Sequence, residues 1–249
     1  MKTMRAALFL PFLAACSIYP RFVASKVIET EIPAGSLQQL ACESHNGDIT
    51  VTGAATDTIT LRVEMSVRGI TQAEADSNLH LLELGREQQG DRLRLYGKYP
   101  PNELDNRSPS FTFTLTAPAR LVLQLESHNG DIVARKVDGT VAAVTHNGRI
   151  RAELASTAVA LKTHNGDVQL QLDGQGPLDG TVESHNGGVD VSFASGRTTA
   201  IAASTHNGRI TANGPVRVLA SGKGSLQGQV GDGGGKLTVT THNGDVTLR

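Results

Sequence analysis

The chain has 249 residues, and its 23 Lys and Arg are matched by 24 Asp and Glu. This balance argues against a basic surface for nucleic acid, so we expect no nucleic-acid partner. Glycine is abundant, with 27 residues, while aromatic residues make up only 4% of the chain. Such a composition is typical of a fold with many tight turns.

Residues 1–15 are predicted to be a lipoprotein signal peptide. Lys2 and Arg5 precede an apolar run that is too short to span a bilayer. The run ends in Leu-Ala-Ala-Cys16, which resembles the lipobox of bacterial lipoproteins. That resemblance implies a lipid on Cys16, which becomes the new N-terminus, and Ser17 implies an outer-membrane address. The alternative is an ordinary secretory signal with an incidental cysteine, and the mature chain is exported in either case.

Residues 16–30 are predicted to be the lipid anchor and a tether, and residues 31–249 a single β-solenoid domain. Removal of the signal would leave 21 basic against 24 acidic residues. A mature chain of roughly 230 residues can bury one continuous core. The other cysteine, Cys42, has no internal disulfide partner and is expected to point into that core.

Residues 54–120 are expected to be a non-repeating insert within the solenoid. Residues 71–82 could hold a short helix, because Thr71 is a suitable N-cap and Glu74 stands three residues later. The alternating residues 58–67 predict a strand, and the flanks of Gly90-Asp91 predict a hairpin. Strands are also expected over 110–116 and 120–126. We expect an antiparallel excursion that packs beside the first rung.

A six-residue phrase recurs seven times along the chain. It reads Ser or Thr, then His-Asn-Gly, then a polar residue or glycine, then Ile or Val. From the second copy the spacings are 18, 18, 21, 21 and 36 residues, and the last gap holds a degenerate copy at 222–226. A period near 20 residues with a fixed turn is typical of a stacked solenoid. The copies centre on His45, His128, His146, His164, His185, His206 and His242.

The alternation of strand side chains assigns an inside and an outside to each phrase. The residue three before each His, the Ser or Thr, and the Ile or Val after the turn should point inward. The His should point outward. Asn-Gly is a strong turn signal, because both residues tolerate positive φ. Stacked corners should place the asparagines at the inner side of the corner in a ladder of about 4.8 Å rise, formed by Asn46, Asn129, Asn147, Asn165, Asn186, Asn207 and Asn243.

Residues 121–249 should therefore be regular rungs of an all-β fold, a single-stranded parallel β-helix with rungs of about 18–21 residues. The antiparallel insert follows the first repeat. The chain stops in the middle of a rung, at residues 246–249, and no capping segment follows. An uncapped C-terminal rung would permit end-to-end self-association.

The repeats at 44–51 and 127–134 read Ser-His-Asn-Gly-Asp-Ile followed by two further residues. Together with the strand-rich insert, they resemble a family of adhesin-like proteins of unknown function, the DUF4097-type β-solenoid, over about residues 25–249. The resemblance implies the fold but brings no established activity and no catalytic residues. This chain departs from the pattern in placing His in every recognisable copy.

The seven histidines form a candidate ligand row on the outward face, about 4.8 Å apart. One reading is duplication with ring stacking and no ligand. The others are a transition metal, for which imidazole is a common ligand, an anionic partner, or a response to pH. No Cys or carboxylate completes a metal site in every rung, so no metal and no cofactor are assigned.

An enzyme is the third possibility, because some parallel β-helices act on polysaccharides through clustered carboxylates. Asp131, Asp167 and Asp245 stand three residues after a His, but Arg149 and Arg209 occupy the same position elsewhere. Alternating charges on successive rungs indicate a solvated ion-pair ladder. We assign no catalytic residues.

The sequence predicts a non-enzymatic, lipid-anchored protein on the periplasmic side of the bacterial outer membrane, acting as a binding or structural module. Its expected partners are the membrane, through the N-terminal lipid, and an envelope protein or glycan. A metal-binding lipoprotein and a carbohydrate-active enzyme are the alternatives.

Overall fold

A computed structural model describes residues 20–100, 102–104 and 106–249. The predicted signal peptide, Cys16, Ser17 and the start of the tether lie outside the described residues. Within the described part of the chain, no helix has the length and apolar character needed to cross a membrane.

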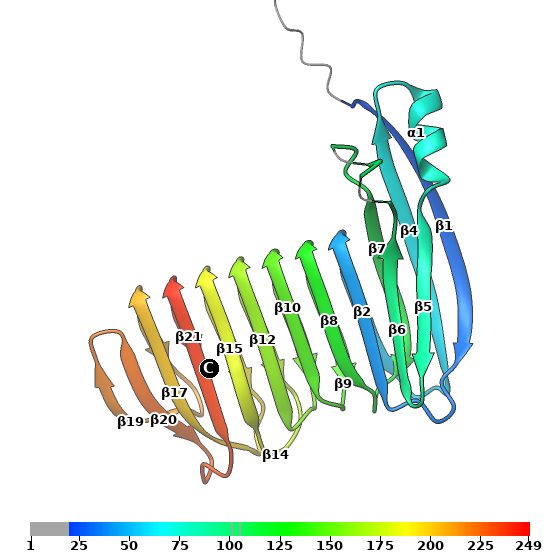
Figure 1. Cartoon of the computed structure of the whole chain (residues 1–249). Coiled ribbons are helices and arrows are strands. Elements are labelled where there is room, and N and C mark those ends of the chain that lie inside the picture. The colour runs from blue at the N-terminus through cyan, green and yellow to red at the C-terminus, as the bar shows by residue number, and fades with distance from the viewer. Residues whose placement is uncertain (1–19, 101, 105) are drawn as a thin grey trace, which may run out of the picture.

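The repeats build two long parallel sheets that face each other (Figure 1). Each rung is a strand of the 12-stranded sheet B, a corner, and a strand of the 10-stranded sheet A. In spatial order the rungs of sheet B are β2 (Gln39–Asn46), β8 (Val122–Asn129), β10 (Val141–Asn147), β12 (Ala158–Asn165), β15 (Asp179–Asn186), β21 (Lys236–Asn243) and β17 (Arg197–Asn207). Their partners in sheet A are β3 (Ile49–Ala54), β9 (Ile132–Val137), β11 (Ile150–Leu154), β13 (Val168–Leu172), β16 (Val189–Phe193), β22 (Val246–Leu248) and β18 (Ile210–Ala212). The predicted β-solenoid is confirmed.

The core lies between the two sheets and consists of the inward residues of every rung. Leu161 in β12 and Leu170 in β13 are at most 2% exposed, and Cys42 in β2 is fully buried. Burial and the nearby Glu43 raise the pKa of the Cys42 thiol well above its usual value, so this thiol is an unreactive core group. The predicted inward and outward faces of the strands are therefore correct.

The buried hydroxyls of the phrase join one rung to the next. Thr163 Oγ1 donates to the carbonyl of Gly148 on the preceding rung at 2.8 Å, and Ser184 Oγ donates to Gly166 at 2.9 Å. A buried hydroxyl without such a bond would cost about 1–3 kcal/mol. This explains why Ser and Thr, and not larger polar residues, precede the histidines. The same bond to a glycine carbonyl is made by Ser127, Thr145, Thr205 and Thr241.

The insert extends both sheets, which corrects the prediction of an antiparallel excursion beside the first rung. It contains β4 (Thr58–Gly69), α1 (Gln72–Leu79), β5 (Glu83–Gln89), β6 (Arg92–Lys98) and β7 (Ser110–Pro118). β6 runs parallel to β2 and β7 runs parallel to β3, so together they act as one more rung. Their backbones satisfy the edges that the first repeat would otherwise leave open. Only β4 and the β5–β6 hairpin are antiparallel, as predicted.

The predicted short helix is present, and it begins at the predicted cap. The Glu74 N–H donates to Thr71 Oγ1 at 3.1 Å, while the Ile70 N–H donates to Glu74 Oε2 at 2.9 Å. Arg107 holds the same carboxylate at 2.6 Å from the loop before β7. The backbone bond from Ile70 and the contact with Arg107 keep the pKa of Glu74 below its usual value.

The predicted tether is wrong over most of its length. Residues Phe22–Pro33 form a 12-residue strand, β1, which pairs antiparallel with β4 at one edge of sheet A. The pairing is favoured because Ala24 and Ile32 are buried. Long alternating strands gain both ladder hydrogen bonds and core contacts, which a solvated tether lacks.

The end of the chain is the largest difference from the sequence prediction. β21 inserts between β15 and β17, and β22 inserts between β16 and β18. The degenerate copy at 222–226 is the turn of an antiparallel hairpin, β19 (Arg217–Gly222) and β20 (Ser225–Val230), and β20 covers the outer edge of β17. The C-terminal rung is therefore internal, which removes the basis for end-to-end association through it. The short β14 (Gly176–Pro177) pairs with the start of β17.

Candidate functional site

The seven phrase histidines form one continuous row of stacked rings on the outer face of sheet B. Neighbouring ring centroids lie 4.6 to 4.9 Å apart. Four of the six pairs are parallel to within 3 to 6°, and the two pairs that involve His146 are tilted by 24 and 26°. The order in space is His45, His128, His146, His164, His185, His242 and His206. We call this set the histidine row.

The predicted asparagine ladder runs beside the histidine row. Asn165 Nδ2 donates to Asn147 Oδ1 at 2.8 Å, and Asn165 Oδ1 accepts from Asn186 Nδ2 at 2.8 Å. The same bond joins every neighbouring pair, and Asn46 ends the ladder by donating to the Pro109 carbonyl at 3.0 Å. The corner is not buried, however, because the Ser or Thr fills the inner position. Six of the seven asparagines are exposed, so the ladder lies on the surface.

The acidic residues after the corner have a structural role that sequence reasoning missed. Asp167 Oδ1 accepts the Gly188 N–H of the next rung at 2.8 Å, and Asp131 Oδ1 accepts the Arg149 N–H at 2.8 Å. Asp48 and Asp245 make the equivalent bond. The sequence predicted charged side chains three residues after most of the histidines. It did not indicate that the carboxylates at this position accept a backbone N–H of the next rung.

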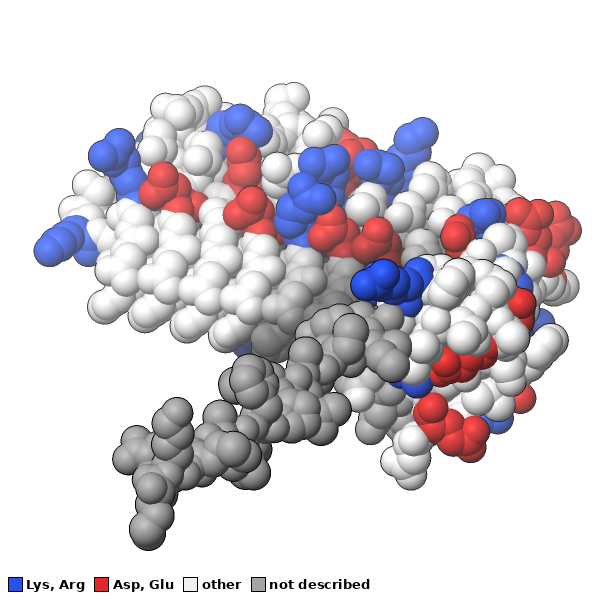
Figure 2. Space-filling view, turned by 90° about the horizontal axis from the view of Figure 1, so that it is seen from above, with Lys and Arg blue, Asp and Glu red and all other residues white. Residues whose placement is uncertain are grey.

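The predicted ion-pair ladder is present at one step. Arg149 contacts Asp131 through Nη2 at 2.8 Å, which raises the pKa of the guanidinium. Both side chains are substantially exposed, so the pair contributes little to stability. A view from above shows rows of uncharged side chains next to a band that contains both acidic and basic side chains (Figure 2).

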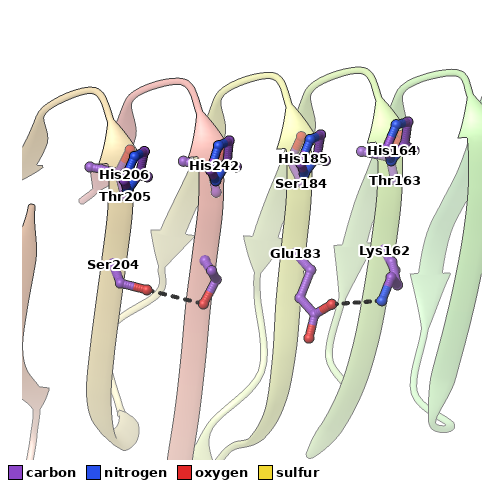
Figure 3. A pocket seen from close by; sticks show the side chains of 12 residues that line it. Lys162, Thr163, His164, Glu183, Ser184, His185, Ser204, Thr205, His206 and His242 are labelled. Atoms are coloured by element: carbon purple, nitrogen blue, oxygen red, sulfur yellow. Dashed lines mark hydrogen bonds and ion pairs between the residues drawn. The ribbon is translucent and has the colours of Figure 1, made fainter.

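A shallow groove of about 570 Å³ follows one half of the histidine row. On its floor Lys162 and Glu183 form an ion pair at 3.1 Å, and the Ser204 and Thr240 hydroxyls are hydrogen-bonded at 3.2 Å (Figure 3). The rings lie along its upper margin, near the corners. These groove histidines are His164, His185, His242 and His206.

The ring spacing is unsuitable for a metal ion shared by neighbouring rings. Zinc–imidazole bonds are about 2.0–2.1 Å long, so two nitrogens on one ion lie at most about 4.2 Å apart. Parallel rings in the same orientation keep like atoms at the centroid spacing, which is 4.6 to 4.9 Å in the histidine row. Within the described ranges, no group of three or more His, Cys, Asp or Glu side chains is arranged to hold a metal.

The environment of the groove makes one imidazole harder to protonate. Partial burial, followed by the proximity of His185 and His146, lowers the pKa of His164. Near the β6 edge of sheet B, Arg94 binds Glu43 through two bonds of 2.7 Å, and these bonds lower the pKa of that carboxyl. The Arg94–Glu43 ion pair thus lies at the end of the histidine row that begins with His45, away from the groove.

We predict that Asn165→Ala costs more stability than His164→Ala. The asparagine makes two ladder bonds, so its loss should reduce the free energy of unfolding by about 1–2 kcal/mol. The exposed imidazole makes only stacking contacts, and its loss should change stability by less than about 0.5 kcal/mol. Urea denaturation of the two variants measures the difference. The reverse order would contradict the assignment of corner stability to the amide ladder.

Comparisons with known proteins support this architecture. A crystal structure of a candidate cell adhesion protein from Clostridium sporogenes matches with a TM-score of 0.57 and 12% identity, covering 90% of this chain and 99% of that one. Candidate adhesins from Bacteroides fragilis (TM-score 0.35, 12% identity) and Parabacteroides distasonis (0.33, 7%) each match over 90% of this chain and 97% of theirs. At 12% identity the likeness to the Clostridium sporogenes protein concerns the fold alone. A search of curated proteins gave no match.

The family assignment rests on a match that spans nearly the whole chain. The model described as Toastrack DUF4097 covers residues 9–249, which include the insert and all seven phrases. The long parallel sheets agree with the β-solenoid-like fold of this family. The chain therefore belongs to the Toastrack DUF4097 family.

Proposed function

We propose that the protein is a non-enzymatic, lipid-anchored module of the bacterial envelope, which binds an envelope component through the outer face of sheet B. The observation that carries the proposal is the histidine row, an unbroken series of seven exposed rings beside an open groove. The fold does not require a row of one residue type on this face, because the neighbouring outward position, two residues before each His, varies along the same strands. It carries Glu126, Val144, Lys162, Glu183, Thr240 and Ser204. Such regularity on an exposed face is what recognition of an extended partner needs.

The two alternatives receive less support from the same features. A shared metal would require neighbouring rings to turn out of their stack, given the spacing described above. Carbohydrate chemistry would require free carboxylates in a groove. Asp131 and Asp167 each accept a backbone N–H of the next rung instead, and Asp131 also pairs with Arg149. Binding without chemistry is therefore the function we favour.

We predict that the anchor is at Cys16, on the periplasmic side of the outer membrane. Cys16→Ser should release the protein from the membrane fraction and abolish labelling by an alkyne fatty acid, because acyl chains supply the membrane affinity. Cys42→Ser is the matched control, since Cys42 is buried in β2 and should leave the label unchanged. Label on the Cys16→Ser protein would contradict the lipid anchor.

The binding role is tested in the same experiment with the released protein. Binding through sheet B alone is reversible, so washing should remove Cys16→Ser protein from the membrane fraction. The same protein, purified and added back to envelopes at high concentration, should sediment with them before washing, and replacement of His164 and His185 by Gln should reduce the sedimented fraction. Replacement of Gln169 and Gln171, which are exposed on β13 in the other sheet, is the control. Equal loss from both faces, or no sedimentation at all, would contradict binding through sheet B.

A further inference from the structure

The stacking of the rings decides which part of each imidazole a partner can reach. Adjacent rings face one another at 4.6 to 4.9 Å, so their planes lie across the solenoid and their edges point to solvent. A sugar that stacks on an aromatic ring needs a free ring face. The histidine row offers N–H and N edges instead, which bind polar and charged groups. Its partner should therefore be recognised by hydrogen bonds and charge.

The charges around the groove are balanced when the rings are neutral. On the strands, Lys162 of β12 faces Glu183 of β15, and the groove positions of β21 and β17 carry hydroxyls. The neighbouring β10 carries His146, and its corner carries Arg149, which pairs with Asp131. The remaining charged groups at the corners and at the turn before β20 are Asp167, Asp245, Arg209 and Lys223. Outside the Arg149–Asp131 pair, the charges of three carboxylates and three cations thus cancel. These residues give the groove a net positive charge only when its rings are protonated.

Regular spacing favours a polymer over a small anion. One small carboxylate can contact two neighbouring edges, whereas the groove presents four edges in line. The Ser204 and Thr240 hydroxyls and the Lys162–Glu183 pair lie beneath those edges and can bond to sugar hydroxyls. A polymer whose units each carry one carboxylate and several hydroxyls can contact the ring edges through its carboxylates and the floor of the groove through its hydroxyls.

We propose that the groove is a pH-dependent binding site for a linear acidic polysaccharide, whose carboxylates align with the protonated edges of the groove histidines. This proposal rests on the proposed function and names its ligand class. Desolvation and the neighbouring His185 and His146 lower the pKa of His164, so this ring takes up a proton less readily than a free imidazole does. A bound polyanion stabilises the imidazolium form, so binding must take up protons, and acidification must strengthen binding.

The direct test uses the detergent-solubilised full chain and polygalacturonate as the probe. Affinity should be at least about tenfold higher near pH 5.5 than near pH 7.5, on either side of the unperturbed imidazole pKa of about 6.5. Calorimetry at one pH in two buffers of different ionisation enthalpy should show net proton uptake on binding. Equal affinity at the two pH values, or proton release, would overturn the proposal.

Substitutions of the row histidines test whether binding depends on the charge of the rings or on their shape. Gln at His164, His185 and His242 should abolish binding near pH 5.5, whereas Gln at His45 and His128, in the same row but outside the groove, should reduce it less than about threefold. His185→Lys supplies a charge that does not titrate in this range, so it should retain binding near pH 7.5. Circular dichroism and melting temperature show whether each variant is folded. Equal losses from the two Gln variants would overturn the site assignment.

Two further probes decide the ligand class. Dextran, which has no charge, should not bind at either pH. Polyphosphate should bind more weakly than polygalacturonate, because it lacks the hydroxyls that the floor of the groove can bond. Strong dextran binding would leave the proposed function standing but overturn the charge-dependent site, and a preference for polyphosphate would overturn the polysaccharide assignment.

Discussion

Gly187→Ala is expected to lower the free energy of unfolding by at least about 3 kcal/mol. A methyl group on Gly187 would lie 2.0 Å from the Gly166 carbonyl oxygen and 2.5 Å from its carbon, both in the backbone of the adjacent rung. Backbone atoms cannot rotate away as a side chain can, so the two rungs must separate. Separation would lengthen the two bonds that join these rungs, from the Gly166 N–H to the Asn186 carbonyl and from the Ser184 hydroxyl to the Gly166 carbonyl.

The next residue provides the matched control. The nearest atoms to a methyl group on Gly188 are the Asp245 carbonyl oxygen at 3.5 Å and Asp167 Oδ1 at 3.7 Å, which are ordinary contacts. Gly188→Ala should therefore change stability by less than about 0.5 kcal/mol in urea denaturation. Both variants restrict the unfolded chain equally, so their difference isolates crowding in the folded state. Similar values for the two would show that the close approach of the rungs is not the constraint.

This glycine shows what the sequence can and cannot reveal. The phrase predicted a turn at Asn-Gly on the ground that both residues tolerate positive φ. Within the described residues, Gly47 is the one phrase glycine with positive φ, at 121°, and no phrase asparagine has it. In the six later copies the glycine is needed because the preceding or following rung passes too close for any side chain. Local sequence suggests a turn, but the distance to the neighbouring rung becomes known only when the rungs are stacked.

The inside and outside of each rung were predictable because alternation is a local property. Leu125, Thr145 and Val168 are buried as their positions in the phrase predict. The order of the rungs was not predictable. Every corner carries the same Asn and His, so any two phrases can pair in register, and Asn243 bonds to both Asn186 and Asn207. The repeats therefore predict the fold, but they do not predict which copies are neighbours in space.

A buried charge is the other feature that no pattern indicated. Arg197 begins β17 and is 1% exposed, and its Nε and Nη2 have no partner among the described residues. Its Nη1 donates to the Gln175 carbonyl at a long 3.4 Å. Burial lowers the pKa of this guanidinium. An arginine in a strand is normally expected at the surface, so its residue type argued against the buried position that it occupies.

Deletion of residues 236–249 should unfold far more of the protein than the loss of a terminal rung would. It removes β21 and β22, which lie between neighbouring rungs in both sheets. Leu237, Val239, Val246 and Leu248 are fully buried there. At about 1.5–3 kcal/mol for each side chain, their loss removes on the order of 6–12 kcal/mol, which is comparable to the whole stability of a typical domain.

Hydrogen exchange of the truncated chain identifies which strands depend on the missing pair. β17 loses β21 and keeps only the hairpin β19–β20 and the two-residue β14, so its amides should exchange rapidly, and those of β15 should exchange faster than in the full chain. β8 and β10 lie on the far side of β12 and should remain protected. If the rungs were stacked in sequence order, the deletion would expose one face of β17 and leave β15 covered by it. Continued protection of β15 and β17 would therefore show that β21 is not the strand between them.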